Sequence, residues 1–324
     1  MRMPESASVS RESAIFEAQP LGLCAGVVRA VNAYDSFVRE NPGETIYSVG
    51  EPAHNTHIIN RFRGMGVQFV ERVSEVPDGG KALFGPHGST PDDIKEAKSR
   101  GLTYVDTECP LVSKVKREVL KSAQEGKTTI YYGQTGHAET RAVMGVAPES
   151  VILVESVEQA LAVEVPDPER IAFNNQTTHN ADEAMEMAHL LTGKYPELVI
   201  PPMEDACYAT RNRQDAVKSV VSEGIDAMVV VGSATSSNSK RLKEVAEQRG
   251  VQVFFVDSVD ELSAEQFSGV SRIGLTAGAS VEDDQVELVR NFLSKVIKID
   301  IEKVIVADET KIAFAPPTVH LPNS

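Results

Sequence analysis

The chain has 324 residues, enough for two or three small domains or one large one. Asp and Glu outnumber Lys and Arg by 47 to 32, giving a net charge of −15, which disfavours broad binding to a nucleic-acid backbone. Any anionic ligand must therefore bind in a local pocket. No apolar run is long enough to span a membrane, and the N-terminal stretch lacks the apolar core of a secretory signal. We predict a cytoplasmic protein with no nucleic-acid or membrane partner.

Residues 1–14 have the polar composition of a disordered segment. The rest of the chain carries three cysteines, Cys24, Cys109 and Cys207. Their odd number and wide spacing argue against a disulfide framework, and the lack of a Cys-x-x-Cys pair disfavours zinc ribbons and thioredoxin-type sites. Taken alone, these facts favour three buried structural thiols.

An internal repeat changes that interpretation. In chain order, each cysteine follows an extended stretch and precedes a segment with the apolar spacing of an amphipathic helix. A β-rich run, a polar loop, a helix, a second strand and a third strand follow it. The three segments that hold these strands are 44–50, 67–76 and 82–90, then 128–133, 151–160 and 171–179, and finally 227–232, 253–262 and 272–280. Because the polar loop that follows each first strand comes 28 to 30 residues after its cysteine, the sequence predicts three units of about 90 residues.

Alternating strands and helices predict an α/β fold of three domains with mainly parallel sheets, related by a pseudo-threefold axis. The predicted units are 15–108, 109–203 and 204–297. Packing of the first strand and the Cys24 segment against the third unit is an alternative to packing within the first. The tail, 298–324, lies outside the repeat and is either an edge strand with a loose end or a partner contact.

Ligands of parallel sheets collect at the carboxyl ends of the strands, where all three cysteines and all the polar loops are expected. Each cysteine should also sit at a helix N-terminus, which favours thiolate. Three converging thiolates indicate a metal site. Zinc is one option, but it lacks the usual ligand spacing. A [4Fe–4S] cluster held by three cysteines is the other, and it would leave one iron open for substrate.

The polar loops carry residues that could line a common pocket: His54, His87, His137, Glu139, Thr177, Ser236, Ser237, Asn238 and Ser280. Each taken singly is more often structural, because Ser and Asn cap helices and Ser and Thr stabilise turns. Their matched positions in three repeats favour a shared site instead. Neutral donors and helix N-termini can bind a phosphate or diphosphate. No nucleotide-binding glycine motif is present, which disfavours a nucleotide cofactor.

At these positions the chain resembles the 4-hydroxy-3-methylbut-2-enyl diphosphate reductases, the LytB-type iron–sulfur enzymes that end the non-mevalonate isoprenoid pathway. The resemblance runs in order across about residues 14–297. It is carried by GLCAGVVRAV around Cys24, AHN at 53–55, HGS at 87–89, CPLVSKV at 109–115, GHAE at 136–139, QTT at 176–178, CYATRNRQ at 207–214, GSATSSNS at 232–239 and TAGAS at 276–280.

The resemblance implies three α/β domains in a trefoil-like arrangement around a central [4Fe–4S] cluster. It implies that Cys24, Cys109 and Cys207 hold the cluster, and that Glu139, aided by His137 and Thr177, delivers protons. The residues implied to bind the substrate diphosphate are His54, His87, His137, Thr177, Ser236, Ser237, Asn238 and Ser280. The implied reaction removes the allylic hydroxyl with two electrons and two protons, and a ferredoxin or flavodoxin is the implied electron donor.

Several residues depart from the family pattern: Leu23 and Glu108 before two of the cysteines, Pro52 and Ala53 before His54, and Ala138 between the histidine and the glutamate. Glu108 matters most, since an ionised carboxylate beside a cluster thiolate would lower the reduction potential. A diverged paralogue acting on a related diphosphate is therefore one alternative. A non-catalytic cluster-binding redox sensor and a three-cysteine zinc hydrolase are two others.

Overall fold

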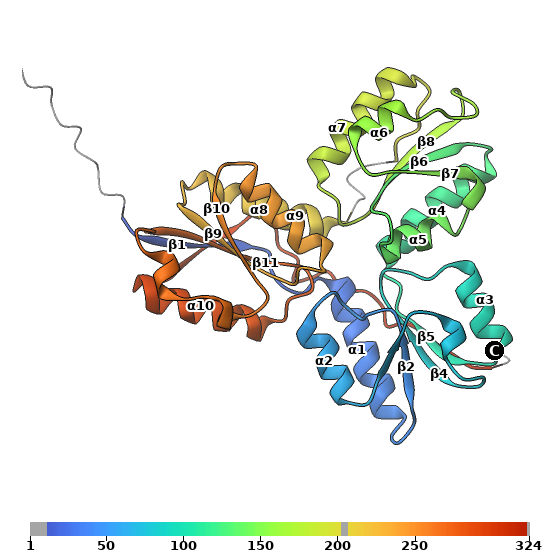
Figure 1. Ribbon diagram of the computed structural model, residues 1–324, viewed down its shortest axis with the longest axis horizontal. Coiled ribbons are helices and arrows are strands. Elements are labelled where there is room, and N and C mark those ends of the chain that lie inside the picture. Colours follow the sequence, from blue (N-terminus) through green and yellow to red (C-terminus); the bar gives the residue numbers. More distant parts are fainter. Residues whose placement is uncertain (1–11, 202–206, 323–324) are drawn as a thin grey trace, which may run out of the picture.

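The computed structural model describes residues 12–201 and 207–322. Residues 1–11, which fall in the segment predicted to be disordered, lie outside this range. The first strand already begins at Ala14, the last residue assigned to that segment. Figure 1 shows three lobes, each built from one sheet and its flanking helices. The predicted α/β fold with three mainly parallel sheets is confirmed.

The three sheets have different strand orders. The first sheet runs β13 (Val319–His320), β5 (Thr103–Asp106), β4 (Lys81–Phe84), β2 (Ile46–Val49) and β3 (Gln68–Val70). The second runs β7 (Val151–Val154), β6 (Thr128–Tyr132) and β8 (Ile171–Asn175). The third runs β10 (Gln252–Val256), β9 (Ala227–Val231), β11 (Arg272–Ala277), β1 (Ala14–Gln19) and β12 (Ile301–Ile305). Among these strands, all pairings are parallel except the antiparallel pair of β13 and β5.

Helices connect the strands. Those of the first lobe are α1 (Ala25–Glu40), α2 (Thr56–Gly64) and α3 (Pro91–Ser99), and those of the second are α4 (Pro110–Gln124), α5 (Ala138–Met144), α6 (Val157–Ala162) and α7 (Ala181–Lys194). The third lobe has α8 (Tyr208–Ser222), α9 (Ser237–Glu247) and α10 (Asp283–Ile297). Short 3₁₀ turns are η1 (Val73–Glu75), η2 (Pro148–Ser150), η4 (Val259–Glu261) and η5 (Ala264–Phe267).

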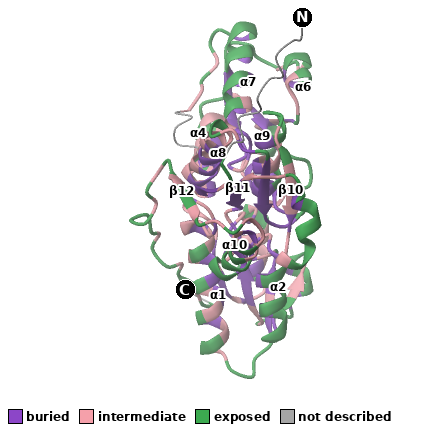
Figure 2. Cartoon of the chain, turned by 90° about the vertical axis from the view of Figure 1, so that its left-hand side faces the viewer, coloured by how far each residue is buried: buried purple, intermediate pink, exposed green. Residues whose placement is uncertain are grey.

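The third sheet is covered on both faces. Val229 and Leu275 pack into one core, and Met228 and Val230 pack into the core on the opposite face. Figure 2 shows this burial as purple strands between helices whose outer surfaces are green. Burial on both faces explains why β9 is a continuous apolar run rather than an alternating one.

The chain crosses between lobes just before the first cysteine. β1 pairs with β11 and β12 in the third sheet, whereas α1 packs through Tyr34 and Phe37 against the first sheet and α2. The first strand therefore packs with the third unit, which was one of the options open from the sequence. The Cys24 segment lies at the crossing itself.

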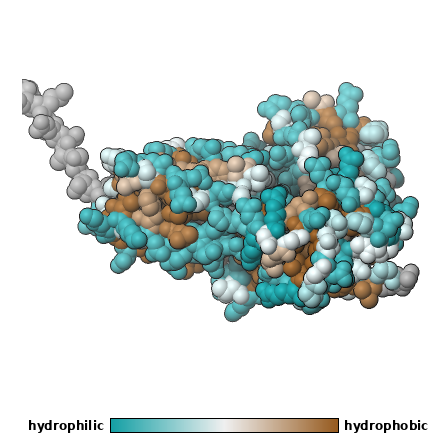
Figure 3. Space-filling view, turned by 60° about the horizontal axis from the view of Figure 1, so that its bottom comes forward, coloured by the Kyte–Doolittle hydropathy of each residue, from teal (hydrophilic) through white to brown (hydrophobic). Residues whose placement is uncertain are grey.

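The tail supplies edge strands to two sheets. β12 extends the third sheet beside β1, and β13 pairs antiparallel with β5 in the first. The sequence left an edge strand as one option, but it did not indicate a second strand on another lobe. Figure 3 shows hydrophobic patches separated by hydrophilic surface on the face it draws. Within residues 12–201 and 207–322, no helix has the length and apolarity needed to cross a membrane.

Candidate active site

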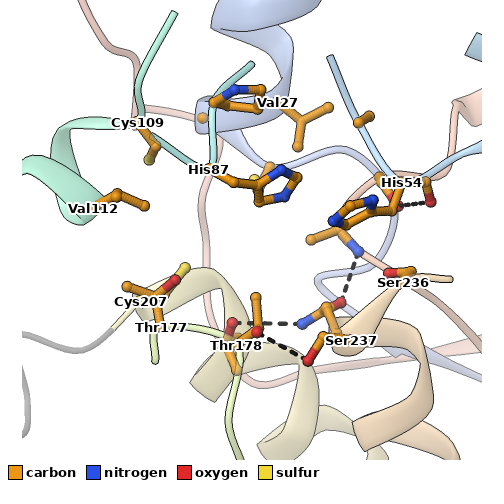
Figure 4. A pocket seen from close by; sticks show the side chains of 18 of the residues that line it. Val27, His54, His87, Cys109, Val112, Thr177, Thr178, Cys207, Ser236 and Ser237 are labelled. Atoms are coloured by element: carbon orange, nitrogen blue, oxygen red, sulfur yellow. Dashed lines mark hydrogen bonds between the residues drawn. The ribbon is translucent and has the colours of Figure 1, made fainter. Parts of the chain in front are cut away.

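The three cysteines occupy equivalent positions. Cys24, Cys109 and Cys207 are the N-cap residues of α1, α4 and α8, as the repeat predicted. All three line one pocket, and Figure 4 shows Cys109 and Cys207 on one side of it. We call the part of the pocket formed by these three residues the thiol end.

Backbone contacts bring the thiols together. A Cβ added at Gly26 would lie 2.8 Å from the Cys109 Sγ and 3.8 Å from the Cys24 Sγ, so the first turn of α1 leaves room for both sulfurs because it has a glycine there. The amide of Cys109 donates to the Pro86 carbonyl, and that of Cys24 donates to the Ala279 carbonyl. These bonds fix two thiols next to the loops that carry His87 and Ser280.

Burial opposes the ionisation of two of the thiols, Cys109 and Cys207. It raises the pKa of Cys109 to about 12, with the neighbouring Cys207 thiol adding to the effect. It raises the pKa of Cys207 to about 11, again with a contribution from a neighbouring thiol, that of Cys24. The expected lowering by a helix N-terminus is therefore outweighed in the protein alone. Three thiolates gathered at this place need a positively charged partner.

Among the described residues, no group of three or more His, Cys, Asp or Glu side chains is arranged to hold a metal ion. A polynuclear cluster makes a different demand, because each thiolate binds a different iron atom.

Three histidines meet at the same pocket. The His54 and His87 rings stack with centroids 4.2 Å apart, and His137 meets both edge-on at 5.6 and 5.5 Å. His54 and His87 follow β2 and β4, and His137 is the N-cap of α5. Parallel strands therefore deliver the first two rings from neighbouring positions of one sheet.

Burial keeps two of the rings neutral. Burial, reinforced by the neighbouring histidines, holds the pKa of His87 well below its usual value. Burial and the His54 ring lower the pKa of His137 to about 4. The Glu139 amide donates to the His137 Nδ1, so the ring carries its proton on Nε2. That Nε2 is buried without a partner and can donate to a ligand.

Hydroxyl and amide groups, together with one histidine ring, form the opposite part of the pocket. We call this part the polar end: His54, Ser236, Ser237, Asn238 and Ser280. Figure 4 shows His54, Ser236 and Ser237 across the pocket from the thiols. Ser236 caps α9 through the Ser239 amide, so its capping role coexists with its place at the pocket. The Asn238 Oδ1 accepts from the Ala279 amide at 2.8 Å, and the Ser280 hydroxyl donates to the His54 carbonyl at 3.2 Å.

Glu139 lies behind Thr177. Its carboxyl is fully buried and sits 2.7 Å from both the amide nitrogen and the hydroxyl of Thr177. Thr177 lines the pocket, whereas Glu139 is absent from the described lining. Burial raises the pKa of Glu139 to about 7, the Thr177 bonds oppose the rise, and the Glu108 charge adds to it. This carboxyl can therefore hold and release a proton near neutral pH.

The structure brings most of the predicted site residues together. Of these predicted residues, only Glu139 does not line the pocket itself, and it contacts the lining residue Thr177. Residues that sequence reasoning missed also line it: Val27, Leu111, Val112, Thr178 and Thr210. Thr178 could have been found, because it neighbours Thr177 in the QTT segment. The valines give no chemical signal in the sequence.

The four histidines that received no predicted role, His57, His179, His189 and His320, do not line the pocket. Two of them have packing partners. His179 stacks on Tyr132 with ring centroids 4.1 Å apart, and His320 of β13 stacks on Tyr104 at 4.6 Å. Their aromatic contacts are structural.

Glu108, the most consequential departure from the family pattern, is paired. The Lys116 ammonium lies 2.5 Å from its Oε2 and also donates to the Ser89 carbonyl. The Ser113 hydroxyl donates to the Glu108 Oε1. A half-buried cation therefore offsets the Glu108 charge next to Cys109.

A family model described as LytB protein matches residues 15–294. The chain is 43% identical to 4-hydroxy-3-methylbut-2-enyl diphosphate reductase 2 of Burkholderia mallei, over 84% of this chain and 83% of that protein. It is 41% identical to the 4-hydroxy-3-methylbut-2-enyl diphosphate reductase of Streptomyces coelicolor, over 93% of this chain and 89% of that protein. The chain belongs to the LytB family.

Solved structures of similar proteins support the same family assignment. The E-1-hydroxy-2-methyl-but-2-enyl-4-diphosphate reductase of Plasmodium falciparum superposes with a TM-score of 0.87 at 27% identity, covering 96% of each chain. A structure of (E)-4-hydroxy-3-methyl-but-2-enyl diphosphate reductase gives a TM-score of 0.62 at 28% identity, covering 87% of this chain and 99% of that one. The resemblance and the enzyme class predicted from the sequence are confirmed.

Proposed function

We propose that this LytB-family enzyme reduces 4-hydroxy-3-methylbut-2-enyl diphosphate to isopentenyl and dimethylallyl diphosphate. The allylic C–O bond breaks, two electrons and two protons enter, and the oxygen leaves as water. The observation that carries the proposal is one pocket with thiols at one end, hydroxyls and histidines at the other, and a buried carboxyl bonded to a lining threonine.

The residues at the thiol end fit a [4Fe–4S] cluster. Cys24, Cys109 and Cys207 come from helices of three different lobes and face one pocket. Figure 4 shows Val112 near Cys109, and Val27 also lines the pocket. These apolar side chains would help to exclude water. When bound through three cysteines, such a cluster supplies electrons and an open iron as a Lewis acid.

Glu139 and Thr177 form the proton path of the proposal. A proton on the Glu139 Oε2 can pass to the Thr177 Oγ1, 2.7 Å away, while the hydroxyl hydrogen of Thr177 passes to the substrate. The hydroxyl then returns to its starting state, with Glu139 as the net donor. The pKa of Glu139, raised to about 7 mainly by burial, suits a general acid at neutral pH.

The proposed diphosphate site consists of the polar end together with three further lining residues, His87, His137 and Thr177. The N-terminus of α9 points its first turn, with Ser237 and Asn238, at this end of the pocket. Binding energy from the remote diphosphate would hold the allylic carbon at the thiol end.

The electron donor is proposed to be a small ferredoxin or flavodoxin, since electrons must reach the thiol end from outside the chain. The cytoplasmic location stays a prediction from the sequence. The Lys116 partner of Glu108 supports the proposed substrate over that of a diverged paralogue, because the carboxylate does not stand beside Cys109 as an uncompensated charge.

The test is an anaerobic assay. The purified chain is reconstituted with iron and sulfide, and oxidation of reduced methyl viologen is followed after adding the hydroxy-methylbutenyl diphosphate. We expect substrate-dependent oxidation in the wild type, with at least a hundredfold loss in Glu139→Gln. Glu149→Gln, at an exposed position in η2, is the matched control and should behave as the wild type. A cluster-loaded wild type without turnover would refute the proposed reaction.

A further inference from the structure

The polar end lacks the side chains that usually bind phosphates. Among the described residues that line the pocket there is no lysine and no arginine. A diphosphate carries at least two negative charges at neutral pH, so neutral donors alone would bind it with a large uncompensated charge. The three histidines are the side chains at the pocket that can supply a positive one.

Two of these histidines are poorly placed to do so. The Glu139 amide donates to the His137 Nδ1, which fixes that ring as a neutral Nε2–H donor. His87 is buried and stacked against His54 at 4.2 Å, so a charge on both stacked rings would be repulsive. In the part of the chain that the structure describes, no carboxylate is bonded to either ring.

His54 differs in having an acid partner. Its Nδ1 lies 2.9 Å from the Glu51 Oε2. A carboxylate only accepts, so the Nδ1 carries a hydrogen. In the neutral ring the Nε2 then carries only a lone pair and cannot donate to a diphosphate. That Nε2 is buried without a partner, and it becomes a donor only when the ring is protonated.

We propose that Glu51 is a positioning residue that holds His54 as an imidazolium when the diphosphate binds, making His54 the cationic donor of an otherwise neutral site. The inference rests on the proposed function and deepens it. Local packing supports the arrangement. A Cβ added at Gly85, two residues before His87, would lie 2.5 Å from the Glu51 carbonyl, so the two histidine loops are held against each other through this backbone contact.

Among the residues that the structure describes, the titratable groups in contact with the His54 ring are Glu51, His87 and His137. Of these groups, Glu51 is the carboxylate, and it is bonded directly to the His54 ring. Glu51 is itself 38% exposed and contributes no atom to the described pocket lining. It therefore acts through His54 and not by contact with substrate.

The test compares cluster-loaded Glu51→Gln with cluster-loaded wild type. Glutamine keeps an acceptor for the His54 Nδ1 and removes the charge. We expect the KM for the hydroxy-methylbutenyl diphosphate to rise roughly tenfold at pH 7 with kcat within about twofold. The Kd of inorganic diphosphate, measured by calorimetry, should rise in parallel. Lowering the pH should restore affinity in the variant more than in the wild type.

Two further variants sharpen the result. Glu44→Gln, at an exposed position just before β2, is the charge-matched control and should leave KM unchanged. Glu51→Asp keeps the charge and should retain more affinity than Glu51→Gln. Equal KM values in Glu51→Gln and Glu44→Gln, or a loss confined to kcat, would overturn the inference and leave the proposed function intact. A wild type that neither turns over nor binds diphosphate would overturn both.

Discussion

The two ends of the pocket are built in different ways. The thiol end stands on the first turns of three long helices, and its cysteines are N-cap residues whose positions the backbone sets. The polar end is assembled from loops that side-chain hydrogen bonds tie together across lobes. Asn55 donates to the Ser280 carbonyl, and Thr178 bonds to Ser237. Under the proposed function, electron transfer takes place at the end built on helices, and substrate recognition takes place at the end built from loops.

Breaking the thiol end should have the largest effect. Cys109→Ser replaces a sulfur at the centre of the three helices, and we expect loss of turnover together with loss of bound iron and of visible absorbance. Iron and sulfide analysis after anaerobic reconstitution is the measurement. A variant with a full cluster and normal turnover would remove Cys109 from the ligand set.

Gly26→Ala alters the thiol end without replacing a cysteine. The added methyl would meet the Cys109 Sγ at 2.8 Å, and alanine is otherwise the better helix former at this position in α1. Iron content should fall while helix content measured by circular dichroism holds. An unchanged iron content would show that the sulfur can move aside at no cost.

Substitutions of two adjacent threonines should affect the proton path and the polar end separately. Thr177→Val removes the hydroxyl between Glu139 and the pocket, and kcat should fall by at least roughly a hundredfold, with a smaller rise in KM because Thr177 also belongs to the proposed diphosphate site. Thr178→Val removes the bond to Ser237 and should act mainly on KM. Thr177→Ser keeps the hydroxyl and should restore most of kcat. Equal kcat losses in both valine variants would contradict the division between the ends.

The acidity of Glu139 should make kcat and KM depend on pH in different ways. Its pKa, raised to about 7 chiefly by burial, means that the donor is protonated below neutrality and ionised above it. We expect kcat to fall about tenfold for each pH unit above about 7, while the KM contribution of the polar end follows a different profile. A kcat that stays constant to pH 9 would show that another group supplies the proton.

The repeat made the core of this molecule predictable. All nine strands expected from it are present, because a buried parallel strand produces a local apolar run that sequence alone reveals. The pocket followed from the same logic, since carboxyl ends of parallel strands converge. Glu139 was identified by type, but its position behind Thr177 depends on how one loop folds over another.

Pairing between strands that lie far apart in the sequence was harder to predict. β1 lies in the third sheet although it begins the chain, and the sequence left that pairing open. β13 is two residues long and antiparallel, which is too short for an alternating apolar pattern to predict a strand. Glu51 was missed because its role depends on a ring nitrogen 2.9 Å away, which residue type does not encode.

The tail offers the smallest predicted effect and contacts the segments that flank two residues of the thiol end. Glu309, between β12 and β13, bonds to Arg213 of α8, whose side chain is 1% exposed. Arg213 also donates to the Gly22 and Ala209 carbonyls, which flank two of the cysteines. The tail thus holds the chain segments behind Cys24 and Cys207 in register.

Glu309→Gln should lower the free energy of unfolding by about 2 kcal/mol, because a buried guanidinium loses its counter-charge but keeps its carbonyl partners. Urea unfolding at pH 7 measures it, with Glu302→Gln on the exposed side of β12 as control. Matching midpoints for the two variants would show that the carbonyls alone satisfy Arg213. A lower midpoint with unchanged iron content would place the role of the tail in stability and not in assembly of the thiol end.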